Sequence, residues 1–139
     1  MSIKFNKRGF FQRLLGIPAT GNPGVDGCWD YADGKLTVDL GKAVELKTPG
    51  GAIKLEGNNL PKRVLVVFGE DGNYHAYHNK CSHMGRRLDP VPGTDTVQCC
   101  SISKSTYDVE GGYLHGPKHH PILSFPIKKD QEKLIISVS

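Results

Sequence analysis

Two cysteine-containing segments, each placed after a short apolar run, restrict the fold of this chain more than any other feature. The first is Cys81-Ser82-His83, and the second is Cys99-Cys100-Ser101-Ile102-Ser103. Thiolate and imidazole are the side chains that bind zinc, iron and iron–sulfur clusters. In the first segment the Cys and the His lie two residues apart, so both can face inward in a tight turn. The two segments can share a metal only if the fold brings two loops together.

The rest of the sequence is made of short apolar runs separated by glycine and proline. Its 17 Gly and 9 Pro in 139 residues are too many for a helical bundle and are typical of a β-protein rich in turns. The continuous apolar run at 63–68 predicts a central strand, and Asp71-Gly72 turns the chain into a second strand at 73–78. We expect further strands at 35–40, 43–46, 52–55, 106–109, 112–115, 122–127 and 134–138, and a short one from Thr96 to the second cysteine segment. The predicted fold is all-β, a small antiparallel β-sandwich or barrel.

The chain divides into three parts. Residues 1–17 carry Phe11, Leu14 and Leu15 at helical spacing among basic residues, which predicts a short N-terminal amphipathic helix. Residues 18–34 are a connector rich in proline and glycine, and residues 35–139 form the domain. A chain of 139 residues suits one compact domain that buries its own hydrophobic core.

Composition excludes several classes of function. The formal charge of +4 is mild, and the basic residues do not gather with aromatics into a stripe, so we expect no nucleic-acid partner. No apolar run reaches the length of a membrane span. Four cysteines without a secretory signal indicate metal or redox use in a reduced compartment, which predicts a cytoplasmic protein.

From about Gly34 onward the chain resembles the Rieske [2Fe–2S] family. Cys81-x-His83-x-Gly85-x-x-Leu88 matches the first ligand motif of that family without a departure, and Asp71-Gly72 and the strand after it resemble the turn and strand that precede the motif. Gly116-Pro117 and Pro121-Ile122 resemble the proline loop that packs over the cluster. The resemblance therefore implies a cluster held by two loops of a small β-scaffold.

The second motif departs from the family pattern, which is Cys-x-x-His-Gly-Ser-x-Phe/Tyr-Asp. Cys100, Ser105 and Tyr107 stand in register, but Ser103 replaces the histidine and Lys104 replaces the glycine. The second ligand motif is thus degenerate. The family's inter-loop disulfide is also absent, because its places hold Arg86 and Ile102, and this puts the chain nearer the ferredoxin and oxygenase branch.

The resemblance assigns roles to the matching residues. Cys81 and Cys100 would hold the inner iron and His83 the outer one. The Ser105 hydroxyl would donate to a cluster sulfide, and the Tyr107 hydroxyl would donate towards a cysteine sulfur. Such hydrogen bonds spread charge away from the cluster and raise its potential.

Four possibilities remain for the missing ligand. Ser103 can ligate through oxygen, although an alkoxide is a harder donor than imidazole. Cys99 can supply a third thiolate, although neighbours on an extended segment point to opposite sides. His119 or His120, in the segment that by resemblance closes over the cluster, can replace the lost histidine. In the last possibility no cluster is bound.

These observations lead to one functional hypothesis and two alternatives. The first is a Rieske-type [2Fe–2S] protein with an atypical fourth ligand, which passes single electrons to or from a partner protein and is a redox subunit rather than a self-sufficient enzyme. The second is a cluster-free Rieske-like domain that serves as a structural or docking subunit of a larger oxidoreductase. The third is a mononuclear site, for example zinc, held by Cys81, His83 and Cys100.

Overall fold

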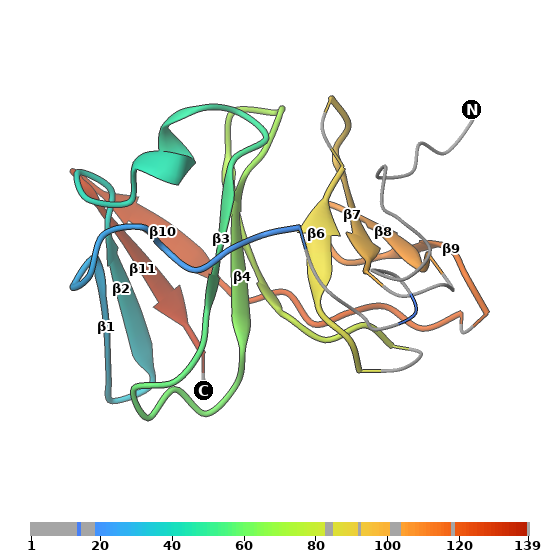
Figure 1. The fold of residues 1–139 in the computed structure, drawn as a ribbon, viewed down its shortest axis with the longest axis horizontal. Coiled ribbons are helices and arrows are strands. Elements are labelled where there is room, and N and C mark those ends of the chain that lie inside the picture. The colour runs from blue at the N-terminus through green and yellow to red at the C-terminus, as the bar shows by residue number, and fades with distance from the viewer. Residues whose placement is uncertain are drawn as a thin grey trace.

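The computed structural model describes residues 14, 19–82, 85–91, 93–100, 104–117 and 119–138. Within these residues the regular structure is almost all antiparallel β, arranged in three sheets. Figure 1 shows one sheet at each side of the molecule and the third between them. The predicted all-β class is therefore confirmed. The helix predicted for residues 1–17 lies outside the described residues, apart from Leu14, which is helical and exposed.

The first sheet joins the two ends of the described chain. Its strand order is β1-β2-β11-β10. The hairpin of β10 and β11 pairs with β2 in antiparallel register, with Leu134 opposite Val38 and Ile136 opposite Leu36. These four side chains are buried on one face. The strands are β1 (Trp29–Ala32), β2 (Lys35–Asp39), β10 (Ile127–Asp130) and β11 (Lys133–Ser137).

The second sheet lies in the middle and consists of β3 (Ala52–Leu55), β4 (Val64–Phe68) and β5 (Tyr74–His78). Both faces of β4 are covered. Val64 and Val66 belong to the core shared with the first sheet, whereas Leu65 and Val67 belong to a second core on the opposite side. A strand that is buried on both faces needs apolar residues at every position, which explains the unbroken apolar run.

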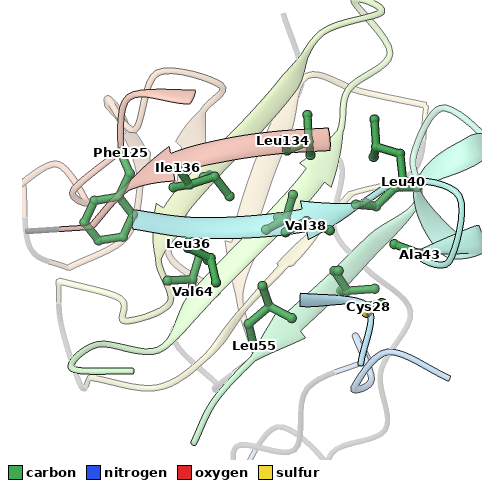
Figure 2. Packing of buried hydrophobic residues seen from close by; sticks show 14 of the residues in the cluster. Cys28, Leu36, Val38, Leu40, Ala43, Leu55, Val64, Phe125, Leu134 and Ile136 are labelled. Carbon is green, nitrogen blue, oxygen red and sulfur yellow. The ribbon is translucent and has the colours of Figure 1, made fainter. Parts of the chain in front are cut away.

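The first core fills the space between these two sheets. Figure 2 shows its side chains converging from β2, β11, β3 and β4. Cys28 is part of this core and is almost fully buried. It is thus a small apolar core residue, far in sequence from both ligand segments.

The third sheet adjoins both cysteine segments, because the first segment precedes β6 and the second begins at the last residue of β7. Its strand order is β6-β7-β8-β9. The second core of the molecule lies between this sheet and the middle sheet. Leu88 pairs with Cys99, and Val97 pairs with Tyr107, so these four side chains share the buried face. The strands are β6 (Leu88–Pro90), β7 (Thr96–Cys99), β8 (Thr106–Asp108) and β9 (Tyr113–His115).

Two predicted strands are wrong. The run at 43–46 is instead part of a 3-10 helix, Val44–Lys47, because Ala43 and Leu46 lie three residues apart and one helical turn buries both. The run at 122–127 is not a strand, since only Ser124 forms a bridge, with Tyr77, and β10 begins at its last residue. In addition, β1 lies inside the segment predicted as a connector.

Candidate metal centre

The first ligand loop is closed at its base by two polar side chains. Buried Asn79 accepts the N–H of Leu88 on its Oδ1 at 2.7 Å, and its own N–H donates to the carbonyl of Arg63 at 2.8 Å. The Arg63 guanidinium donates to the carbonyls of Asn79 (2.9 Å) and Gly85 (2.7 Å). The residues that enter and leave the loop are therefore held side by side, with Cys81 at the entrance.

Within this loop the backbone turns tightly around Cys81. The Cys81 N–H donates to the carbonyl of Arg86 at 2.8 Å, and its carbonyl accepts the N–H of Gly85 at 3.2 Å. Gly85 has a φ of 68°, a conformation that glycine adopts without strain. The Cys81 side chain is buried. His83 lies outside the described residues.

The second ligand segment is joined to the first by its backbone. The Cys100 N–H donates to the carbonyl of Arg87 at 3.0 Å. Cys100 is buried, and its thiol is close enough to Cys81 for the two to interact electrostatically. Burial raises the pKa of the Cys100 thiol, and Asp89 and Cys81 act in the same direction. The two predicted cysteine ligands therefore lie in adjoining segments, since Cys81 bonds to Arg86 and Cys100 to Arg87 through the backbone.

Cys99 ends β7 and Cys100 follows it, and successive residues of an extended segment point to opposite sides. Cys99 packs in the second core beside Leu88 and Val97, and Cys100 lies outside that core. All four cysteines of the chain lie within the described residues, and none forms a disulfide. Cys99 therefore serves the hydrophobic core.

The Tyr107 hydroxyl reaches from β8 into the first ligand loop. It accepts the N–H of Ser82 at 3.0 Å and shares a hydrogen bond of 2.7 Å with Ser82 Oγ. Burial raises the pKa of Tyr107, while its hydrogen bonds to Ser82 and Ser105 act in the opposite direction. The phenol also interacts electrostatically with Cys81. Tyr107 thus links both loops. In the first loop it bonds to Ser82, the residue between the predicted ligands Cys81 and His83.

Gly116 presses against Ser105. A Cβ on Gly116 would lie 2.6 Å from Ser105 Oγ and 2.9 Å from Ser105 Cα, and the φ of Gly116 is 129°. Ser105 is fully buried, and its carbonyl accepts the N–H of Cys99 at 2.7 Å. The chain at Gly116 therefore packs closely against Ser105, at the C-terminal end of the second ligand segment.

Two candidate fourth ligands lie further along this segment. The His119 ring stacks on the ring of Tyr113 with 4.6 Å between centroids, and the Tyr113 hydroxyl donates to the carbonyl of Gly116 at 2.7 Å. His119 and His120 are both exposed. The third candidate, Ser103, lies outside the described residues.

Lys104 occupies the place of the glycine in the family motif. Its φ is 53°, in the left-handed region that glycine adopts at little cost. The backbone therefore keeps the conformation that favours glycine although the residue has changed. The sequence identified the replacement of glycine by Lys104, but it did not indicate the left-handed backbone conformation at this position.

The donors present fit an iron–sulfur cluster held by two loops. Two buried thiols, Cys81 and Cys100, stand at adjoining loop bases, which is the thiolate half of a Rieske ligand set. No group of three or more His, Cys, Asp or Glu side chains converges among the residues that the structure describes. His83, which matches the family motif, and Ser103, which departs from it, both lie outside that part of the chain.

Two acidic residues support the site and were missed by the sequence analysis. Buried Asp89, on β6, accepts the N–H groups of Ala19 (2.9 Å) and Thr20 (2.8 Å), which fastens the N-terminal part of the chain to the sheet. Glu56 forms a two-pronged ion pair with Arg87, at 2.9 and 2.5 Å. The local sequence around these two acids gives no sign of either contact, because both partners are distant in the chain.

Comparison with known proteins identifies the family of the chain. A model of the Rieske [2Fe-2S] domain matches residues 37–126, which is more than half of the chain. The chain belongs to the Rieske family. No helix of the described residues is long and apolar enough to cross a membrane.

Curated relatives of this Rieske protein come from two kinds of system. A glycine betaine monooxygenase oxygenase subunit from Chromohalobacter salexigens is 30% identical over 76 residues, which are 54% of this chain and only 17% of that relative. The cytochrome b6-f complex iron-sulfur subunit of Chlorobaculum tepidum is 26% identical over 99% of this chain and 78% of its own length. The chain thus spans about a sixth of the oxygenase subunit that it matches.

Among solved structures, the ferredoxin of carbazole 1,9a-dioxygenase from Nocardioides aromaticivorans IC177 has a TM-score of 0.56 at 19% identity, covering 66% of this chain and 88% of the ferredoxin. A quaternary ammonium Rieske monooxygenase has a TM-score of 0.55 at 15% identity and covers 69% of this chain and 31% of its own. At these identities the likeness establishes the fold alone.

Proposed function

We propose that this Rieske protein carries single electrons between partner proteins on a [2Fe–2S] cluster with an atypical fourth ligand. The observation that carries the proposal is the pair of buried thiols, Cys81 and Cys100, at the bases of two loops joined by the bond from Cys100 N–H to Arg87. When bound, such a cluster supplies a one-electron couple. Cys81, His83 and Cys100 would hold it, with Ser103, His119 or His120 as the remaining ligand.

The residues of the chain have separate tasks in this function. Burial of both cysteines keeps water from the sulfur atoms. The hydroxyl of Tyr107 and the buried Ser105 fix the two loops against each other. Polar groups beside ligand sulfurs adjust a redox potential. The relatives named above belong to systems in which Rieske proteins work with redox partners, which supports the role of a carrier or redox subunit.

Iron and sulfide analysis of anaerobically prepared protein tests the proposal. About two irons and two sulfides per chain, with visible charge-transfer absorption, are expected. Cys81→Ala and Cys100→Ala should each abolish the colour. Cys28→Ala is the matched control, because Cys28 is an equally buried thiol of the other core, and it should keep the colour. A colourless, iron-free preparation after reconstitution would contradict the proposal.

The fourth ligand can be identified by electron paramagnetic resonance of the reduced protein. Three single variants are compared with the parent: Ser103→Ala, His119→Ala and His120→Ala. Only the variant that removes the ligand should change the parent spectrum. Ser103→His restores the family motif and should give the spectrum of a cluster with two histidine ligands. If all three alanine variants keep the parent spectrum, none of these residues is the ligand.

A cluster-free docking subunit is the second candidate. The replacement of histidine by Ser103 and of glycine by Lys104 favours it, because both changes fall in one ligand motif. In that case Cys81→Ala changes neither metal content nor any redox property. Metal analysis after growth with both iron and zinc also separates the cluster from a mononuclear zinc site.

A further inference from the structure

A cluster of positive charge lies beside the first ligand loop. Lys62 and Arg63 lie before β4, His78 ends β5, and Lys80 precedes Cys81. Burial lowers the pKa of His78, and the charges of Lys62, Lys80 and Arg63 lower it further. The pairing of Val64 with His78, and the bond from the Asn79 N–H to the Arg63 carbonyl at 2.8 Å, place these residues next to one another. We call Lys62, Arg63, His78, Lys80 and the adjoining Leu123 the basic patch.

Glu56 interacts electrostatically with Arg63, whereas the two lysines of the basic patch form no ion pair among the described residues. Among the described residues, the ion pairs involve Lys54, Arg87 and His75, and neither Lys62 nor Lys80 has a carboxylate partner. Arg63 donates to uncharged carbonyl groups of the ligand loop. The cations of the patch repel one another, and an acidic surface placed opposite them would offset that repulsion by attracting them.

An apolar side chain stands inside this charged region. Leu123 is 49% exposed, and its carbonyl accepts the N–H of His78 at 2.8 Å. On the other side, the Lys80 chain lies along the ligand loop, because a Cβ on Gly85 would be 3.4 Å from Lys80 Cε. The patch thus combines an exposed leucine with several cationic residues beside the loop that carries Cys81.

We propose that the basic patch is the docking surface for the acidic face of a redox partner protein. This proposal rests on the proposed electron-carrying role, because a partner docked on the basic patch would lie beside the Cys81 loop. Charge complementarity steers encounter, and the exposed leucine adds apolar contact at short range. An acidic protein surface fits this pattern better than an anionic membrane, because the apolar component is a single side chain rather than an amphipathic helix.

The test uses a carboxylate-terminated monolayer on gold as the acidic probe. Adsorbed mass is read with a quartz crystal microbalance, and electron exchange is read by voltammetry on the same surface. The patch variant is Lys62→Glu/Lys80→Glu. The matched control is Lys128→Glu/Lys129→Glu, which changes two exposed lysines of β10 in the first sheet. Each Lys→Glu change removes two unit charges, so both double variants lower the formal charge from +4 to zero.

The parent protein should adsorb at low ionic strength and leave the surface as salt is raised. The patch variant should bind about tenfold more weakly than the control variant, although their net charges are equal. Equal loss in the two double variants would overturn the proposal, because binding would then follow net charge alone.

Two further readouts keep the outcomes distinct. Vesicles of phosphatidylcholine with phosphatidylserine serve as an anionic lipid probe, and patch-dependent binding to them without binding to the monolayer would replace the protein partner by a membrane. Adsorption does not depend on a cluster, whereas the voltammetric current does. Patch-dependent adsorption without current would therefore leave the docking surface standing while the electron-carrying function fails.

Discussion

The backbone N–H of Cys100 donates to the carbonyl of Arg87 at 3.0 Å, so the second cysteine is fastened to the strand that leaves the first ligand loop. The Arg87 side chain in turn holds Glu56, which follows β3 of the middle sheet. The ligand region is therefore connected to the middle sheet through one ion pair as well as through the second core.

This ion pair predicts an acid-sensitive contribution to stability. The hydrogen bonds and charge of Arg87 lower the pKa of Glu56 from its ordinary value of 4.5. Below 4.5 the unfolded chain takes up a proton before the folded chain does, so the contribution is present above that pH and is lost as pH falls through the folded value. Glu56→Gln should cost about 1 kcal/mol or less at neutral pH and give a flatter acid limb in urea unfolding. An unchanged acid limb would contradict this assignment.

Loss of the Tyr107 hydroxyl should weaken the contact between the loops. Tyr107→Phe leaves the N–H of Ser82 without its acceptor, which should lower the free energy of unfolding by about 1–2 kcal/mol. Urea unfolding measures this change. If the cluster is bound, its potential should also fall, because a polar group near the ligand sulfur is removed.

The control for this change is Tyr113→Phe. The Tyr113 hydroxyl donates to the carbonyl of Gly116 in a more exposed setting, so its loss should cost less stability and should shift the potential less than the loss of the Tyr107 hydroxyl does. Equal shifts of potential in the two variants would show that the effect is not specific to the contact between Tyr107 and Ser82.

The parts of the fold predicted from sequence are those in which one local rule decides. The apolar run of β4 and the Asp71-Gly72 turn predict the central hairpin, and Gly72 has the φ of 80° that such a turn requires. Alternation along β7 likewise predicts that Cys99 and Cys100 point to opposite sides. In these cases the backbone geometry follows from neighbouring residues alone.

The parts that were missed depend on partners distant in the chain. Strand β1 forms because Trp29–Ala32 pairs with β2, and its glycine-rich surroundings give no sign of that pairing. The buried role of Asp89 depends on Ala19 and Thr20, about seventy positions away. The identity of the fourth ligand also depends on loop placement rather than on spacing. Local pattern cannot predict such long-range contacts.

Lys104 should be strained by its backbone conformation. With a φ of 53°, it costs more than glycine would, so Lys104→Gly should stabilise the fold by roughly 1 kcal/mol despite the greater freedom of glycine in the unfolded chain. Gln131→Gly is the matched control, because Gln131 has a φ of 55° in an exposed turn far from the site. If Lys104→Gly destabilises while the control stabilises, then contacts of the lysine side chain outweigh the strain.

Gly116→Ala should disturb the site more than its backbone strain alone predicts. The added Cβ would meet Ser105 at 2.6–2.9 Å, and Ser105 is buried next to Tyr107 and cannot retreat into solvent. Gly57→Ala is the matched control, because Gly57 has a φ of 85° with nothing within 4 Å of the new Cβ. Both variants carry the left-handed penalty, so their difference reports the clash, which we expect to cost a further 1–3 kcal/mol or so. Thermal unfolding of the two variants measures it, and equal melting temperatures would mean that the covering segment moves away from Ser105 without cost.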